Sequence, residues 1–205
     1  MGLWEKHVVP SLVNRFCSAS TIERQRRKIV PQATGRVLEI GIGSGFNLPF
    51  YDVDAVEEVW GLDPSAPLRA QAAARAQGLP FPTHMTDYAQ GRIPADPASF
   101  DTVVVTYTLC SIPNLAEVLA DVRRVMRPEA ALLFSEHGRA PDAGVHKVQR
   151  LMTPVWRRLG GGCHLGRDIP GVLREAGFEV PELESMYLPG PRFLNFNYWG
   201  RAVPA

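Results

Sequence analysis

A glycine-rich turn after a short apolar segment is the feature of this sequence best suited to bind a ligand. Residues 39–45 read Glu39-Ile-Gly41-Ile-Gly43-Ser-Gly45, directly after a strand-like segment and before a stretch that we expect to be helical. Glycines let the backbone turn tightly and approach a ligand closely. We therefore expect a ligand site where this strand ends.

The spacing of the glycines distinguishes between the ligands that such a turn can bind. A dinucleotide fingerprint needs a third glycine at position 46, where this chain has Phe46, and a phosphate loop needs Gly-Lys-Ser/Thr, which does not follow here. Glu39 would place a negative charge beside a pyrophosphate but suits a cationic amino-acid ligand. The turn therefore favours a ligand that carries positive charge.

Two more carboxylates follow strand-like segments. Asp63, which precedes Pro64, ends segment 56–62 and can accept hydrogen bonds from both hydroxyls of a ribose. The alternative is that Asp63 only begins a helix. Asp87 follows segment 81–85 and can either accept a hydrogen bond from an adenine amino group or be an ordinary loop carboxylate.

Short apolar segments alternate with helical ones from about residue 36, which is typical of a parallel α/β sheet with helices on both faces. We expect helices at 65–77, 114–126 and 168–177, and strands at 36–40, 56–62, 81–85, 100–106, 130–134, 181–188 and 195–203. Parallel strands bring their carboxyl ends, and with them the turn and both carboxylates, to one edge.

Composition narrows the class of protein. The 205 residues have a net charge of +1, which gives no reason to expect a nucleic-acid partner. The three cysteines are far apart in the sequence and do not suggest a disulfide framework. No secretion signal or membrane span is evident, so we expect a cytoplasmic protein. The partly amphipathic segment 3–16 leaves weak contact with a membrane surface as an alternative. The basic run 24–28 is interpreted as a solvated helix end.

The motifs E-I-G-I-G-S-G, G-L-D-P, S-F-D-T-V-V-V and V-R-R-V-M-R-P-E together resemble the class I S-adenosylmethionine-dependent methyltransferases over about residues 34–137. The family usually has Pro-Gly-Gly where this chain has Pro128-Glu129-Ala130, which affects the turn before the fifth strand. The resemblance implies a Rossmann-like seven-stranded sheet with helices on both faces and a C-terminal antiparallel strand pair. It also implies S-adenosylmethionine as cofactor and S-adenosylhomocysteine as product.

The resemblance also implies roles for individual residues. The three glycines would approach the methionine moiety, Asn47 its carboxylate and Asp63 the ribose, while Thr106 and Tyr107 would lie beside the sulfonium. The expected cofactor-binding residues are Glu39, Gly41, Gly43, Gly45, Asn47, Asp63, Pro64, Asp87, Thr106 and Tyr107.

A narrower resemblance extends towards the C-terminus. The segments G-F-N-L-P-F-Y, T-L-C-S, S-E-H and G-G-C-H-L-G-R are similar to the alkyl-thiol methyltransferases of the methyltransferase-like seven group, and more weakly to ubiquinone/menaquinone-type enzymes. That group carries an N-terminal membrane anchor, which we do not expect here. We therefore expect methyl transfer to a small apolar acceptor such as a thiol. The alternatives are a phospholipid or quinone-precursor methyltransferase at a membrane surface, and a cofactor-binding module without catalysis.

The acceptor side of the site has three candidate catalytic residues. His137, expected at the sheet edge, is a candidate base or acceptor-orienting group, or else a capping histidine. Tyr107 and Cys110 are expected to line the pocket, although Cys110 also fits a buried structural role. We expect no metal site, because Cys163 and the histidines show no paired ligand spacing.

We expect two parts of the chain, a helical cap segment at 1–33 and a methyltransferase domain at 34–205. Residues 138–167 would form an insertion that covers the acceptor. Sequence alone gives no oligomeric state.

Overall fold

Seven strands form one mixed sheet in the order β3-β2-β1-β4-β5-β7-β6. The computed structural model describes residues 19–88 and 91–205. Strands β1 to β5 pair in parallel, and β7 runs antiparallel to both β5 and β6. The expected fold class, including the C-terminal antiparallel pair, is confirmed. The strands are β1 Gly35–Ile40, β2 Val56–Leu62, β3 Thr83–Thr86, β4 Phe100–Thr106, β5 Met126–His137, β6 Phe178–Tyr187 and β7 Phe196–Pro204.

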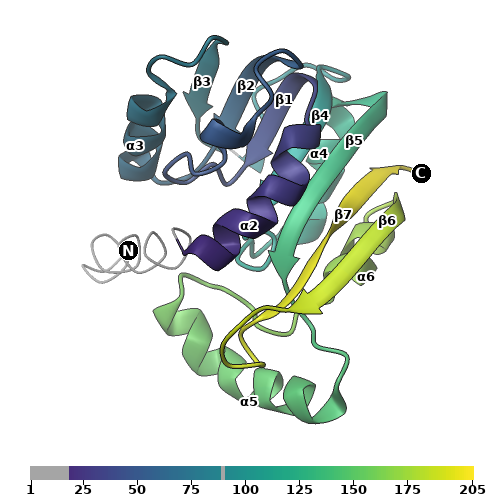
Figure 1. Ribbon diagram of the computed structural model, residues 1–205. Coiled ribbons are helices and arrows are strands. Elements are labelled where there is room, and N and C mark those ends of the chain that lie inside the picture. The colour runs from purple at the N-terminus through teal and green to yellow at the C-terminus, as the bar shows by residue number, and fades with distance from the viewer. Residues whose placement is uncertain (1–18, 89–90) are drawn as a thin grey trace.

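Helices cover both faces of the sheet. In Figure 1, α2 crosses the front of the sheet, whereas α4 and α6 lie behind it and α5 lies below. The helices are α2 Ser20–Ile29, α3 Ala66–Ala76, α4 Leu115–Val125, α5 Ala143–Leu159 and α6 Ile169–Glu175. None of the helices described is long and apolar enough to cross a membrane.

The local sequence explains the central elements. Phe100–Thr106 reads FDTVVVT, and its β-branched residues suit a strand that is covered on both faces. In α4, Leu115, Val118 and Val122 recur at helical spacing and are buried against the sheet. Asp168 begins α6 as predicted, because its side chain accepts a hydrogen bond from Gly171 N at 3.1 Å.

Two predicted elements differ in the structure. The helix expected after the glycines is only a 3-10 turn, Leu48–Phe50, because the chain must reach β2 within a few residues. Strand β5 extends well beyond the predicted 130–134, since its last residues pair with β7, with His137 opposite Asn197. Asn114 makes no side-chain cap to the α4 backbone and instead donates to Glu117.

The strand order of the sheet indicates a ligand site at the carboxyl end of β1. Strand β1 pairs with β2 on one side and with β4 on the other, so the strand order reverses there. In open α/β sheets, ligands bind beyond the carboxyl ends of the strands at this switch point. The glycine turn, Asp63 and Tyr107 all follow strands that end at this edge.

Candidate active site

A cavity of about 680 Å³ opens where β1, β2 and β4 end. Its size lies within the range of small-molecule and cofactor pockets. Most of the cofactor-binding residues expected from the sequence line it, namely Glu39, Gly41, Gly43, Asn47, Asp63, Pro64, Thr106 and Tyr107. Gly45 and Asp87 do not line this cavity.

The three glycines of the turn have different structural roles. All three have positive φ, at +71° for Gly41, +55° for Gly43 and +79° for Gly45. A Cβ on Gly41 would clash with the side chain of Thr108, and one on Gly45 would lie 3.0 Å from Ala72 Cα in α3. Only Gly43 faces open space, with Gly41 O at 3.9 Å as the nearest atom. Gly43 is therefore where a ligand can approach the backbone most closely.

Glu39 is a fully buried carboxylate in the cavity wall, with 1% of its surface exposed. It accepts hydrogen bonds from Asn47 Nδ2 at 2.9 Å and from Tyr51 OH at 2.7 Å. Burial raises the pKa of Glu39 to about 7, although both hydrogen bonds oppose the shift. A cationic ligand in the cavity would favour its ionised form.

Asp63 connects the glycine turn to the turn that follows β2. Its Oδ2 accepts from Gly43 N at 3.1 Å and its Oδ1 accepts from Ser65 N at 2.8 Å. Burial raises the pKa of Asp63 above its ordinary value, although these two backbone hydrogen bonds oppose the rise. Asp87 is half exposed and lies 3.8 Å from Arg69, and its neighbour Tyr88 lines the cavity instead.

Tyr107 has a strained backbone at the end of β4. Its φ is +53°, which is uncommon for a bulky residue, and such strain is often found at functional sites. Its N donates to Ser135 O at 2.9 Å and its OH donates to Asn197 Oδ1 at 2.7 Å. These bonds to β5 and β7 hold the ring in the cavity wall.

Arg26 is a site residue that the sequence interpretation missed. The basic run is not simply a solvated helix end, because Arg26 is 5% exposed and lines the cavity. Its guanidinium carbon lies 5.4 Å from the centre of the Phe46 ring and 5.9 Å from that of Tyr107. The helical spacing from Ile22 to Arg26 to Ile29 could have indicated this buried face. Other lining residues not anticipated include Phe46, Leu68, Tyr88, Ser111, Ile112, Glu117, Gly160 and Gly161.

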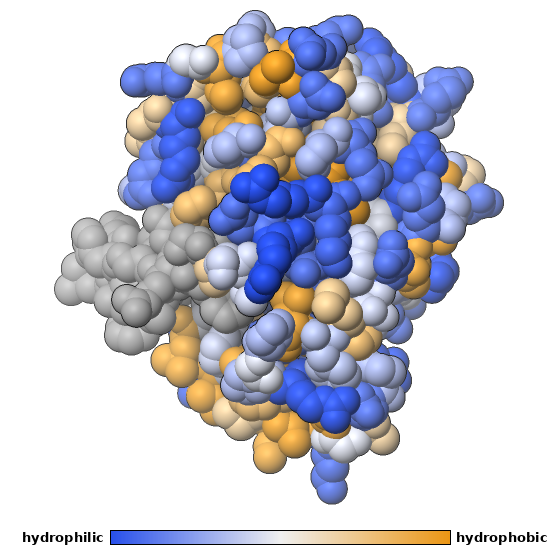
Figure 2. Space-filling view, viewed as in Figure 1, coloured by the Kyte–Doolittle hydropathy of each residue, from blue (hydrophilic) through white to orange (hydrophobic). Residues whose placement is uncertain are grey.

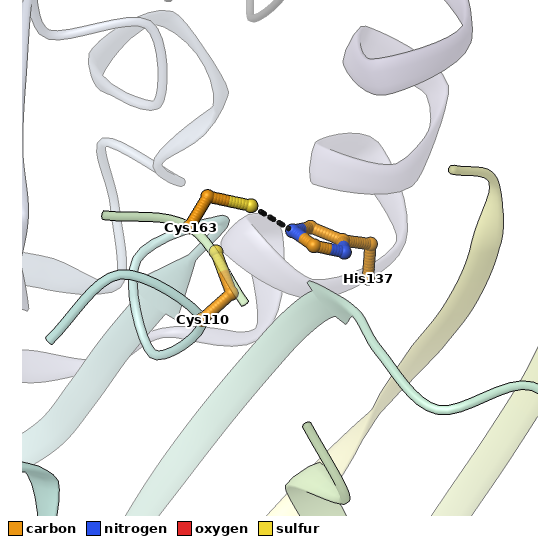
Figure 3. Close-up of side chains that lie close together, drawn as sticks. All are labelled: Cys110, His137 and Cys163. Atoms are coloured by element: carbon orange, nitrogen blue, oxygen red, sulfur yellow. Dashed lines mark hydrogen bonds between the residues drawn. The ribbon is translucent and has the colours of Figure 1, made fainter. Parts of the chain in front are cut away.

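His137 and Cys110 meet Cys163 in a cluster beside the cavity (Figure 3). His137 Nε2 lies 3.1 Å from Cys163 Sγ. None of the three lines the cavity, although Ser111, next to Cys110, does. Of the three predicted catalytic residues, only Tyr107 is in the cavity wall.

The pKa values of the three side chains in the cluster are shifted from their ordinary values. A hydrogen bond from Cys163 and the charge of His137 hold the pKa of the Cys110 thiol well below its usual range. The same hydrogen bond and burial raise the pKa of Cys163. Burial works against a charged His137, but the negative charge of Cys110 raises its pKa. Negative charge on Cys110 and positive charge on His137 therefore favour each other.

The chain is similar to known methyltransferases along most of its length. Residues 38–134 match the family described as "Methyltransferase domain". The thiol S-methyltransferase TMT1B of Rattus norvegicus is 31% identical over 90% of this chain and 82% of its own length. A phosphatidylethanolamine N-methyltransferase of Cereibacter sphaeroides is 29% identical over 87% of this chain and 88% of its own length.

Solved structures show the same fold. A SAM-dependent methyltransferase from Aquifex aeolicus superimposes with a TM-score of 0.68 at 15% identity, covering 96% of this chain and 98% of that one. The methyl donor is S-adenosylmethionine, and the open backbone at Gly43 and the buried carboxylates in the cavity fit it. The chain belongs to the class I S-adenosylmethionine-dependent methyltransferases, the family that includes these thiol S-methyltransferases.

Proposed function

We propose that this enzyme methylates the sulfur of a small apolar thiol. The observation that carries the proposal is the make-up of the cavity wall. Among the lining residues that the structure describes there is no His, Lys or Cys, whereas Arg26 offers a buried cation. Of the three lining carboxylates, Glu39 and Asp63 lie where we expect the methyl donor, and Glu117 is exposed and accepts a hydrogen bond from Asn114. The similarity to thiol S-methyltransferases over 90% of the chain supports the same acceptor class.

Thiol chemistry fits a site of this kind. S-adenosylmethionine supplies a methyl group on a positively charged sulfur. A thiol with a pKa of about 8.5 is partly ionised near neutral pH and needs no dedicated base, whereas an alcohol does. The guanidinium of Arg26 would increase the thiolate fraction, because a nearby positive charge lowers the pKa of a thiol. Positioning and exclusion of water then supply the acceleration.

Individual residues would hold the methyl donor at the carboxyl edge of the sheet. Gly43 lets the backbone approach it, and Glu39 balances its cationic amino-acid part. Asp63 lies where the ribose hydroxyls of a nucleoside would reach it. Asn47 is positioned by its bonds to Glu39 and Thr106.

The test is an acceptor panel with one carbon skeleton and different nucleophiles. The purified enzyme is mixed with S-adenosylmethionine and an alkyl thiol, the matching alcohol or the matching amine, and S-adenosylhomocysteine is measured. We expect product with the thiol alone, and an Asp63→Ala variant should bind S-adenosylhomocysteine more weakly in calorimetry. Turnover of the amine without turnover of the thiol would refute the acceptor class.

A second candidate function, action at a membrane surface, rests on the outer face of α5. Val148, Leu151, Val155 and Leu159 recur at helical spacing and are 41%, 76%, 54% and 46% exposed. Figure 2 shows this apolar surface at the lower edge of the molecule, where α5 lies in Figure 1. The helix has one lysine, three arginines and no acidic residue. We propose that this face contacts an anionic bilayer.

Vesicle flotation tests the membrane candidate. Wild-type protein should float with vesicles that contain anionic phospholipid and less with neutral vesicles. Leu151→Glu should abolish flotation, whereas Leu183→Glu, an exposed change on β6, should not. Equal recovery of wild type and Leu151→Glu with anionic vesicles would remove this candidate and leave thiol methylation unaffected.

A further inference from the structure

Three side chains from separate segments meet beside the cavity and are of the types that bind soft metal ions. Cys110 follows β4, His137 ends β5 and Cys163 follows α5. One donor atom from each lies within 4.8 Å of the other two. In Figure 3 the two sulfurs and the imidazole point towards one another.

The separations match those of a tetrahedral ion. Zinc has Zn–S distances of about 2.3 Å and Zn–N distances of about 2.0–2.1 Å, which place its ligand atoms about 3.5–3.8 Å apart. His137 Nε2 and Cys163 Sγ are 3.1 Å apart, and no pair of donors in the cluster exceeds 4.8 Å. Shifts of about 1 Å would bring all three to zinc-binding separations.

We propose that Cys110, His137 and Cys163 bind one zinc ion. In the part of the chain that the structure describes, no fourth His, Cys, Asp or Glu belongs to this group. The fourth position would therefore be open to water or an exogenous sulfur ligand. Two cysteines, one histidine and an exchangeable position form an established type of zinc site.

The cluster is enclosed by buried side chains. Cys110 is 2% and Cys163 8% exposed, and Met152 and Trp156 pack against them, so water screens the cluster little. Glu136 is 0% exposed and its Oε1 accepts from the backbone of the loop that leads to Cys110. Its Oε2 has no hydrogen-bond partner among the described residues.

Local spacing could not reveal the site. The expectation of no metal site rested on the lack of paired ligands close together in the sequence. The structure instead brings the donors together from three loops around the ends of β4, β5 and α5. The site does not depend on the acceptor proposed above, because none of its residues lines the cavity.

Cobalt and zinc titration tests the proposal on the whole chain. The protein is purified with a phosphine reductant, stripped of metal, and titrated with Co²⁺. We expect one equivalent to bind with a thiolate-to-cobalt charge-transfer band, and Zn²⁺ to displace it. Cys110→Ser, Cys163→Ser and His137→Asn should each weaken binding at least about tenfold. His84→Gln, an exposed change on β3, should bind as wild type does.

A further variant distinguishes metal binding from thiol chemistry. Cys163→His should retain the ion with a weaker charge-transfer band, because nitrogen replaces one sulfur ligand. A disulfide or a hydrogen-bonded thiol cluster would not give this retention. Circular dichroism establishes that each variant is folded. The proposal is overturned if reduced, folded wild type takes up no cobalt, or if both serine variants bind it as tightly as wild type.

Discussion

The buried carboxylate of Glu39 links proton binding to stability. Its pKa is raised to about 7 by burial, so the folded protein binds a proton that the unfolded chain binds only near the ordinary glutamate pKa. The stabilisation from this proton is complete below the unfolded pKa and is lost as pH rises through about 7. The unliganded enzyme thus becomes less stable as Glu39 acquires the charge that suits a cationic ligand.

Replacing Glu39 by glutamine should change the pH dependence of stability. Glutamine cannot ionise, so wild type should lose stability relative to Glu39→Gln between pH 5 and pH 8. Urea denaturation at several pH values without cofactor measures this difference. A stability difference that is the same at pH 5 and pH 8 would show that Glu39 is not the group responsible. In the same variant, affinity for S-adenosylhomocysteine should fall at pH 8.

Arg26 should affect the pH profile of catalysis rather than the fold. Without its positive charge, the acceptor thiol ionises nearer its own pKa, so kcat/KM of Arg26→Met should rise at higher pH than that of wild type. The control is Arg27→Met, which removes an exposed arginine paired with Glu23. Coincident profiles for wild type and Arg26→Met would exclude thiolate stabilisation by Arg26.

Residues next to predicted strands could be placed from the sequence, whereas contacts between distant segments could not. The positions of Gly43 and Asp63 follow from strand ends and spacing, and both line the cavity. Arg26 comes from a helix that packs across the sheet, and Cys163 meets His137 through the path of the α5 region. No local sequence pattern predicts these contacts.

One buried side chain of helix α5, that of Gln149, forms hydrogen bonds to the segments on both sides of the helix. Gln149 is 1% exposed, and its Oε1 accepts from Ala140 N at 3.0 Å. Its Nε2 donates to Gly138 O at 2.9 Å and to Leu165 O at 3.1 Å. Gln149 therefore fixes the segments on both sides of α5, including the approach to the cluster at Cys163.

Removing this amide should destabilise the protein markedly. Gln149→Leu leaves several buried backbone groups without partners, and we expect a loss of about 2–4 kcal/mol in the free energy of unfolding. Urea denaturation measures it. Leu151→Gln, on the exposed face of the same helix, should stay within about 0.5 kcal/mol of wild type. A comparably small effect of Gln149→Leu would mean that α5 is held mainly by apolar contacts.

Element type was easier to predict than element length. Most residues of β4 are β-branched, so the strand was predicted with its correct ends. Strand β5 begins and ends in more polar sequence, and only its pairing with β4 and β7 makes these ends strand. The region 138–167 does contain a helix, but Leu151 faces solvent while Met152 and Trp156 pack on the cysteine cluster.

At the scale of the whole molecule, cofactor binding should stabilise the fold. At a ligand concentration of 100 times Kd, S-adenosylhomocysteine should add about 2.7 kcal/mol. In a protein of this size, that raises Tm by about 5–10 °C. Thermal melting with and without the ligand measures the shift, and Asp63→Ala should show a smaller one at the same concentration. An unchanged Tm at high ligand concentration would mean that the cavity does not bind this nucleoside.

The overall topology could be predicted because strand and helix patterns alternate regularly along the chain. Alternation predicts parallel strands, and crossover connections between them have a fixed hand. The position of β7 between β5 and β6 could not be derived in the same way. This position depends on the pairing of β7 with β5, a strand that lies far earlier in the chain. Neither strand has a sequence pattern that predicts which strand it pairs with.

The position of β7 in the sheet also affects the order in which strands can pair during synthesis on the ribosome. Residues 178–187 of β6 leave the ribosome before residues 196–204, yet in the finished sheet β6 pairs only with β7. Until β7 has emerged, β6 has no partner and the outer side of β5 is an uncovered strand edge. Such edges attract other nascent chains. The chain therefore exposes unpaired strand edges until its last stage of folding, when a late strand must insert between two that are already present.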